Sequence, residues 1–196
     1  MTRLSPAPDE VQEQVSEELA MAAAVMGFEA NSLKMMAHRP DILRGFLTFF
    51  GAILGPDGLL DGGLRQLIAH VASAAAGCNY CQAHTAHSAH HRGIAAEKIE
   101  NLWSYDSSPL FSDGERAALR LAQAAASVPN AASDDHFAAA RQYYSEAEIA
   151  EIIAVVAAFG FLNRWNDTLA TALEDSPLAF ADSHLVAAGW VAGKHE

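Results

Sequence analysis

The sequence has few basic residues, few cysteines and no long apolar run, and each shortage excludes a class of protein. Only 12 Lys and Arg stand against 24 Asp and Glu, for a formal net charge of −12. Phosphate backbones are bound by clustered positive charge, so we expect no nucleic-acid partner. The longest apolar run, residues 152–162, falls well short of the roughly 20 residues that span a bilayer, so we expect no membrane association.

The first ten residues, MTRLSPAPDE, lack the apolar segment of a secretory signal, which predicts a cytoplasmic protein. Thiols stay reduced in that compartment, and two cysteines three positions apart close too small a loop to stabilise a fold. Cys78 and Cys81 are therefore candidates for redox chemistry or metal binding. With 196 residues and 51% hydrophobic composition, the chain can form a core without a disulfide.

Alternating strand patterns are absent and alanine is abundant, which predicts an all-α helical bundle in one domain over residues 1–196. Gly77 is expected as a left-handed helix stop, and Ser112 and Ser145 begin capping boxes. Residues 193–196 are expected to fray. The expected helices run over residues 9–26, 40–54, 64–76, 78–92 and 177–190, and two more begin near 113 and 146.

An internal similarity relates two parts of the chain at a spacing of 85 residues. Residues 66–72 (QLIAHVA) resemble residues 151–157 (EIIAVVA), and Cys78-Asn-Tyr-Cys81 then falls on Asn163-Arg-Trp-Asn166. Two duplicated helical hairpins would produce this pattern, with the thiols kept only in the first. Shared composition of alanine-rich helices is the alternative explanation.

The residues that could carry chemistry are concentrated in residues 77–87, GCNYCQAHTAH. Helical residues three apart have Cα atoms roughly 5 to 5.5 Å apart, within the range of a disulfide. Cys78 and Cys81 can therefore interconvert between dithiol and disulfide with little backbone movement. The free N–H groups and the dipole at a helix N-terminus favour an anion, so a thiol there is expected to ionise more readily than a free cysteine.

Histidines follow the cysteines along one side of the same predicted helix. We expect His84, one turn past Cys81, to accept and return a proton during thiolate attack; a solvated polar stripe is the alternative. One alternative to redox chemistry is a structural zinc site formed by these Cys and His residues. Another is that the thiols are buried and inert. However, Cys78 and His87 are about 13 Å apart by helical rise, too far to share one tetrahedral ion. We predict no metal and no other cofactor.

This order of residues resembles the carboxymuconolactone decarboxylase and alkylhydroperoxidase D superfamily, particularly its peroxidase-related members. The resemblance spans residues 38–174. Its most specific part is the helix, Gly, Cys-x-Tyr-Cys and His-Thr order at the start of the redox hairpin, residues 64–92, and residues 161–168 (FLNRWNDT) support it.

The resemblance implies an all-helical homo-oligomer, a dimer, trimer or hexamer, that acts as a peroxidase. Cys78 and Cys81 would cycle through a disulfide, with a small-molecule hydroperoxide as substrate and a thiol or protein as reductant. In the family the second cysteine, here Cys81, attacks the peroxide and the first, here Cys78, resolves the sulfenic acid. Helix-end electrostatics alone favour Cys78 as the stronger acid, so the order within the pair stays open.

Two positions depart from the family pattern. The family has a proton-relay glutamate twelve residues before the first cysteine, where this chain has Gln66, which cannot exchange a proton in the ordinary way. His70, one turn further on, is the candidate to replace it, and Glu151 of the second repeat is a weaker one. The family histidine lies four residues after the second cysteine, whereas His84 lies three after it and Thr85 takes position four.

The leading hypothesis is therefore a thiol-dependent peroxidase. One alternative is a lyase like carboxymuconolactone decarboxylase, for which Arg65 and Arg92 are the nearest candidates to bind a carboxylate. The other is a non-enzymatic, redox-sensing oligomer.

Overall fold

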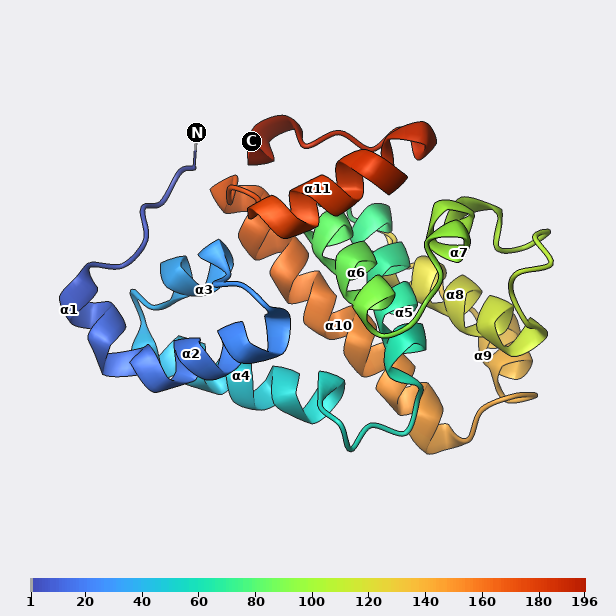
Figure 1. The fold of residues 1–196 in the computed structure, drawn as a ribbon. Helices are drawn as coiled ribbons and strands as arrows, with labels where there is room; N and C mark the ends of the chain where they lie inside the picture. The colour runs from blue at the N-terminus through green and yellow to red at the C-terminus, as the bar shows by residue number, and fades with distance from the viewer. Residues whose placement is uncertain (1) are drawn as a thin grey trace.

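The computed structural model describes residues 2–196, and within this range all regular structure is helical, as predicted (Figure 1). The α-helices are α1 (Asp9–Gln12), α2 (Ser16–Met26), α3 (Asn31–Met36), α4 (Pro40–Leu54), α5 (Gly62–Ala75), α6 (Asn79–His91), α7 (Ala96–Glu100), α8 (Asp113–Ala126), α9 (Asp134–Ala140), α10 (Glu146–Leu169) and α11 (Asp175–His184). Short 3-10 helices are η1 (Glu13–Val15), η2 (Leu102–Ser104), η3 (Val186–Ala188) and η4 (Gly193–His195). Each of the described helices is too short or too polar to cross a bilayer.

Local sequence signals set several helix starts correctly. Pro40 occupies the first turn of α4, where its missing N–H costs nothing. Both capping boxes form: the amide of Glu115 donates to Ser112 Oγ at 3.2 Å, and that of Glu148 donates to Ser145 Oγ at 3.3 Å. The predicted helix over residues 9–26 has the right ends but is interrupted by η1.

The redox hairpin consists of α5 and α6, joined by a sharp turn. Asp61 caps α5 by accepting the amides of Gly63 and Leu64 at 2.9 and 3.0 Å, so the helix begins two residues earlier than predicted. Gly77 has a φ of +72°, the left-handed conformation expected of a helix stop. Cys78 then becomes the N-cap of α6.

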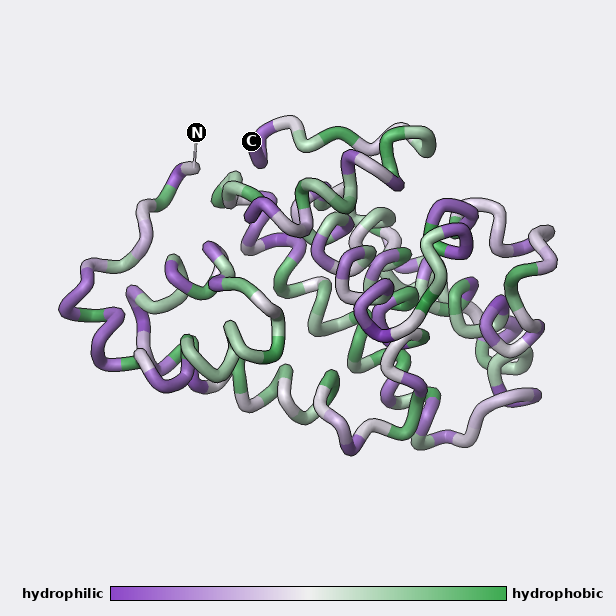
Figure 2. Tube along the Cα trace, in the orientation of Figure 1, coloured by the Kyte–Doolittle hydropathy of each residue, from purple (hydrophilic) through white to green (hydrophobic). Residues whose placement is uncertain are grey.

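Helix α5 is the centre of the bundle. It packs against α6, α8 and α10, and most of its residues are buried. Figure 2 shows the middle of α10 in green, the hydrophobic colour, and its two ends in purple. Ile152 and Val155 of α10 are fully buried in the same cluster as Leu67 and Ile68 of α5. Apolar contact between these helices therefore fixes the face that carries the thiols.

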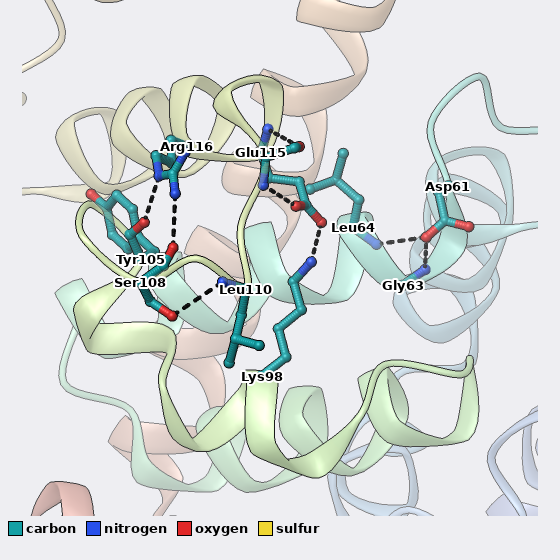
Figure 3. A network of polar contacts seen from close by, with 10 residues as sticks. Asp61, Gly63, Leu64, Lys98, Tyr105, Ser108, Leu110, Glu115 and Arg116 are labelled. Atoms are coloured by element: carbon teal, nitrogen blue, oxygen red, sulfur yellow. Dashed lines mark hydrogen bonds and ion pairs between the residues drawn. The ribbon is translucent and has the colours of Figure 1, made fainter.

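Hydrogen bonds and an ion pair connect the segment between α6 and α8 to the bundle (Figure 3). Lys98 Nζ of α7 lies 2.6 Å from Glu115 Oε1 at the start of α8. The Arg116 guanidinium donates to the carbonyl oxygens of Tyr105 at 3.0 Å and Ser108 at 2.7 Å. These bonds connect the carbonyls of the loop before α8 to the first turn of that helix.

The second repeat does not form a hairpin. Residues 151–168 lie within the single helix α10, so the prediction of two duplicated hairpins is corrected on this point. The position equivalent to Gly77 is Leu162, which continues the helix, and the left-handed residue comes later, at Ala170 with a φ of +50°. The similarity is therefore a similarity of sequence, and it relates two helices, α5 and α10, that pack against each other.

The end of the chain is ordered, so the prediction that residues 193–196 fray is wrong. His195 is 1% exposed; its Nδ1 lies 2.8 Å from the carbonyl oxygen of Thr171, and its own carbonyl accepts the amide of Leu173 at 2.8 Å. Its ring lies 5.9 Å from that of Tyr80 on α6. The last predicted helix also ends early, because α11 stops at His184.

Replacing His195 with alanine should lower the free energy of unfolding by about 2 kcal/mol, because the variant loses a buried hydrogen bond and the packing on Tyr80. Urea unfolding of both proteins measures the difference. Lys194→Ala is the control, since its ion pair with Asp167 is exposed and contributes little. Equal losses in the two variants would show that His195 does not anchor the tail.

Candidate functional site

Both cysteines are reduced and buried at the start of α6. The amide of Cys81 donates to Cys78 Sγ at 3.4 Å, so the side chain of Cys78 caps the helix. Tyr80 completes this cluster, and Leu162 and Leu173 pack against it. Cys78 therefore lies just before the helix, in an extended conformation, and Cys81 lies in its first turn, and reversible disulfide formation between them stays a prediction.

An asparagine of α10 contacts one of the sulfurs. Asn166 Nδ2 donates to Cys81 Sγ at 3.6 Å, and both residues are buried. One turn earlier, Asn163 Nδ2 donates to the carbonyl of Ala72 on α5 at 3.5 Å. Sequence analysis did not select either asparagine, although the 85-residue similarity aligned them with Cys81 and Cys78 and was the signal that could have done so.

The acidity expected for a helix-end thiol does not hold for Cys81. Burial raises the pKa of its thiol well above the usual range, and the neighbouring sulfur of Cys78 raises it further. The hydrogen bond from Asn166 acts in the opposite direction but does not outweigh burial. The prediction was based on the helix dipole and left out desolvation, which is the largest cause of the raised pKa of Cys81, a residue that is 2% exposed.

His84 forms a buried pair with Glu174, which precedes α11. Its Nε2 lies 2.6 Å from Glu174 Oε2, and its ring stacks on Tyr80 with centroids 4.2 Å apart. Glu174 Oε1 also accepts the Tyr80 hydroxyl at 2.9 Å and the Asn31 amide at 2.6 Å. Glu174 was not predicted, since nothing near it in the sequence indicates that it lies against a helix some 90 positions earlier.

The three donors keep Glu174 ionised. Burial raises the pKa of its carboxyl, but the hydrogen bond and charge of His84, with the bonds from Asn31 and Tyr80, outweigh burial and hold that pKa below its ordinary value. A carboxylate only accepts hydrogen bonds, so His84 Nε2 must carry the hydrogen. When the ring of His84 is neutral, its lone pair is therefore on Nδ1, so the carboxylate orients the ring as a base.

His70 and Gln66 are both buried on α5, close to α6. His70 Nδ1 donates to the carbonyl of Gln82 at 3.0 Å and lies 3.1 Å from Thr85 Oγ1, whose hydroxyl bonds the Cys81 carbonyl at 2.7 Å. These contacts join His70 to the backbone of the cysteine helix rather than to a sulfur. The proton-relay role of His70 and the place of Gln66 in the catalytic site stay predictions.

Glu151 does not reach the thiols. Its carboxylate accepts the amides of Leu59 at 2.7 Å and Leu60 at 3.4 Å, and lies 3.5 Å from Arg65 Nε. Arg65 in turn donates to the carbonyls of Ile53 and Gly55. Both side chains therefore hold the loop between α4 and α5, and Arg65 is occupied rather than free to bind a substrate carboxylate.

The later histidines of α6 pair with each other. Nε2 of His87 and Nε2 of His91 are 3.0 Å apart. Burial lowers the pKa of His87 to about 4, and the positive charges of the nearby His91, His84 and His90 contribute smaller decreases. In residues 2–196, no group of three or more His, Cys, Asp or Glu side chains is placed to hold a metal ion.

Comparison with known proteins identifies the family. Residues 40–124 match the carboxymuconolactone decarboxylase family. The crystal structure of the debrominase Bmp8 without ligand is 31% identical, with a TM-score of 0.85, and the match covers 93% of this chain and 97% of that chain. This chain belongs to the carboxymuconolactone decarboxylase and alkylhydroperoxidase D-like superfamily.

Other solved members of the superfamily share the fold. A cysteine-to-alanine variant of Bmp8 in complex with 2,3,4-tribromopyrrole is 30% identical, with a TM-score of 0.86 over the same shares of both chains. An uncharacterized peroxidase-related protein from Ralstonia eutropha JMP134 is 24% identical, with a TM-score of 0.76 over 92% of this chain and 95% of that chain. No curated protein matches the sequence significantly.

His70 should make the stability of this superfamily member depend on pH. Burial lowers its pKa from 6.5 to about 4, so the neutral ring stabilises the fold above pH 6.5, and this contribution is lost as the pH falls toward 4. At 1.36 kcal/mol per pKa unit, the loss between pH 7 and pH 5 is about 2 kcal/mol.

Urea unfolding of the wild type and His70→Gln at the two pH values measures this difference. The variant should lose about 2 kcal/mol less than the wild type on acidification. His38→Gln, at an exposed histidine, should keep the wild-type dependence. Parallel pH curves for the wild type and His70→Gln would contradict the assignment.

Proposed function

We propose that this protein is a thiol-dependent oxidoreductase that reduces hydroperoxides through a Cys78–Cys81 dithiol–disulfide cycle. The observation that supports it most is the pair of reduced sulfurs one helical turn apart, with Cys78 Sγ bound by the Cys81 amide. The oriented imidazole of His84, one turn beyond Cys81, adds a group that can move protons.

In this proposal Cys81 attacks and Cys78 resolves. The Cys81 thiolate attacks the terminal oxygen of ROOH, the O–O bond breaks, and the alkoxide leaves as ROH with a proton from His84. The resulting sulfenic acid is attacked by Cys78, which forms the disulfide and releases water. A thiol or protein reductant then restores both thiols by exchange. The Cys81 amide donates to Cys78 Sγ and so holds the resolving sulfur at the N-terminus of α6.

Reductive debromination is the second candidate, because the debrominase Bmp8 is 30–31% identical over nearly its whole length. The same cysteine pair can supply the two electrons. A sulfur takes bromine from the ring, the ring carbon takes a proton, and the second thiol displaces bromide as the disulfide forms. The net reaction converts one aryl bromide and two thiols into an arene, hydrogen bromide and one disulfide.

The lyase alternative receives less support from the site. Arg65 is bound to Glu151 and to two carbonyls of the α4–α5 loop, and Arg92 is at the opposite end of α6 from the cysteines. A carboxylate substrate near the thiols would need a cationic or donor group that these two arginines do not provide.

Stopped-flow mixing of the reduced protein with cumene hydroperoxide tests the proposal. We expect a rate at least a hundredfold above that of free cysteine, lost in Cys81→Ser. Cys78→Ser should react once and then stop without forming a disulfide. 2,3,4-Tribromopyrrole, with bromide release as the readout, tests the second candidate in parallel. Full peroxidase activity in Cys81→Ser would exclude the mechanism, and a rate equal to that of free cysteine would exclude the function.

Glu174→Gln tests whether His84 works as an oriented base. The variant keeps the shape of the side chain but removes the charge that holds His84 Nε2–H, so we expect kcat/KM to fall ten- to a hundredfold and its pH profile to shift. Glu146→Gln, which removes an exposed partner of Arg141, is the matched control. A lower rate with an unchanged pH profile would mean that Glu174 acts only through folding.

A further inference from the structure

Three buried oxygens beside the thiols have no hydrogen-bond partner among the described residues: Asn163 Oδ1, Asn166 Oδ1 and Ser73 Oγ. All three side chains are less than 4% exposed. Leaving a buried acceptor unpaired costs roughly 1–3 kcal/mol, so such atoms usually have a partner in solution or in a complex. Their concentration at one place suggests that the partner is a ligand of this site.

The two asparagines present the same kind of atom. They lie one turn apart on α10, and each directs its NH2 group at the redox hairpin, Asn163 at the Ala72 carbonyl and Asn166 at Cys81 Sγ. Ser73 belongs to the same contact region, because its carbonyl accepts the amide of Cys78 at 3.0 Å. One N–H of each amide is engaged in this way, and the oxygens are the acceptors that remain without a partner.

We propose that Asn166 is a catalytic residue that donates a hydrogen bond to the Cys81 thiolate, while its oxygen and that of Asn163 accept an N–H or O–H of the substrate. The proposal rests on the thiol-dependent reduction proposed above and narrows its substrate class. Substrates carry a hydrogen-bond donor on or next to the reacting atom: the terminal O–H of a hydroperoxide, or the ring N–H of a halogenated pyrrole.

The donor half follows from the burial of Cys81. A sulfur without solvent can ionise only if neighbouring groups replace the hydrogen bonds that water would donate. The Cys81 amide is directed at Cys78 Sγ, so the Asn166 amide is the donor that the structure provides to Cys81 itself. A neutral donor stabilises the thiolate without bringing a second buried charge into the core.

The acceptor half follows from the unpaired oxygens. Two unpaired acceptor oxygens disfavour a substrate that places only hydrogen-bond acceptors against them. They favour a substrate that places an N–H or O–H group there. Sites with buried groups of one polarity discriminate strongly against analogues that lack the matching group. N-methylation of a pyrrole removes the matching hydrogen with little other change in the ring, so it provides a direct probe.

The donor half is tested without any substrate. In a Cys78→Ser background, Cys81 is modified with methyl methanethiosulfonate, a small reagent that reacts with thiolates, from pH 7 to 9. Asn166→Ala should slow the reaction about tenfold at each pH, Asn166→Ser should restore part of the rate through its hydroxyl, and Asn130→Ala, at an exposed asparagine, should change nothing. Alanine also opens space beside Cys81, and easier access of the reagent to the sulfur would raise the rate rather than lower it. An unchanged or faster rate in Asn166→Ala overturns the donor half.

The acceptor half is tested by binding. Calorimetry with the Cys78→Ser/Cys81→Ser protein, which has no thiol to react, compares 2,3,4-tribromopyrrole with its N-methyl derivative, and we expect at least tenfold tighter binding of the N–H form. Asn163→Ala should reduce this ratio. Equal affinities, or no binding of either pyrrole, overturn the acceptor half. If neither hydroperoxide nor bromopyrrole is reduced while Asn166→Ala still slows thiol modification, the proposed function fails and the role of Asn166 stands.

Discussion

The left-handed turn at Gly77 is the constraint on which the site depends. It ends α5 and starts α6 at Cys78, so the first cysteine caps a helix instead of lying inside one. An ordinary residue would resist a φ of +72°, and a continuous helix would direct the Cys81 amide at a carbonyl rather than at a sulfur. Helix α10 shows the contrast, because it passes the equivalent position, Leu162, without a break and carries asparagines where α6 carries thiols.

The hydrogen-bond donors to the two sulfurs are uncharged. The groups that hydrogen-bond to them, the Cys81 amide and Asn166, are neutral, whereas the carboxylate of Glu174 contacts Tyr80 and His84 rather than a sulfur. A carboxylate in direct contact would oppose formation of a thiolate in a core of low dielectric. In the proposed mechanism the imidazole of His84 exchanges protons near the pair, and the carboxylate of Glu174 orients that imidazole.

Local signals predicted much of the fold, and tertiary contacts explain what they missed. Pro40, Gly77 and the boxes at Ser112 and Ser145 mark helix ends because a few neighbouring residues determine those ends. Glu174 could not be found in this way, since its importance comes only from packing against α6. The acidity of Cys81 was misjudged for a related reason: the helix dipole can be read from a sequence, but burial by Leu162 and Leu173 cannot.

The anchored tail has a practical consequence for anyone who handles this protein. The Trp190 indole donates to the Asn79 carbonyl in the first turn of α6, and His195 lies against Tyr80, which stacks on His84. A purification tag fused after Glu196, or trimming by a protease, would act on a segment that touches the thiol helix. Recombinant material extended after Glu196 is therefore altered near the thiol helix, and the position of a tag belongs among the variables of an assay.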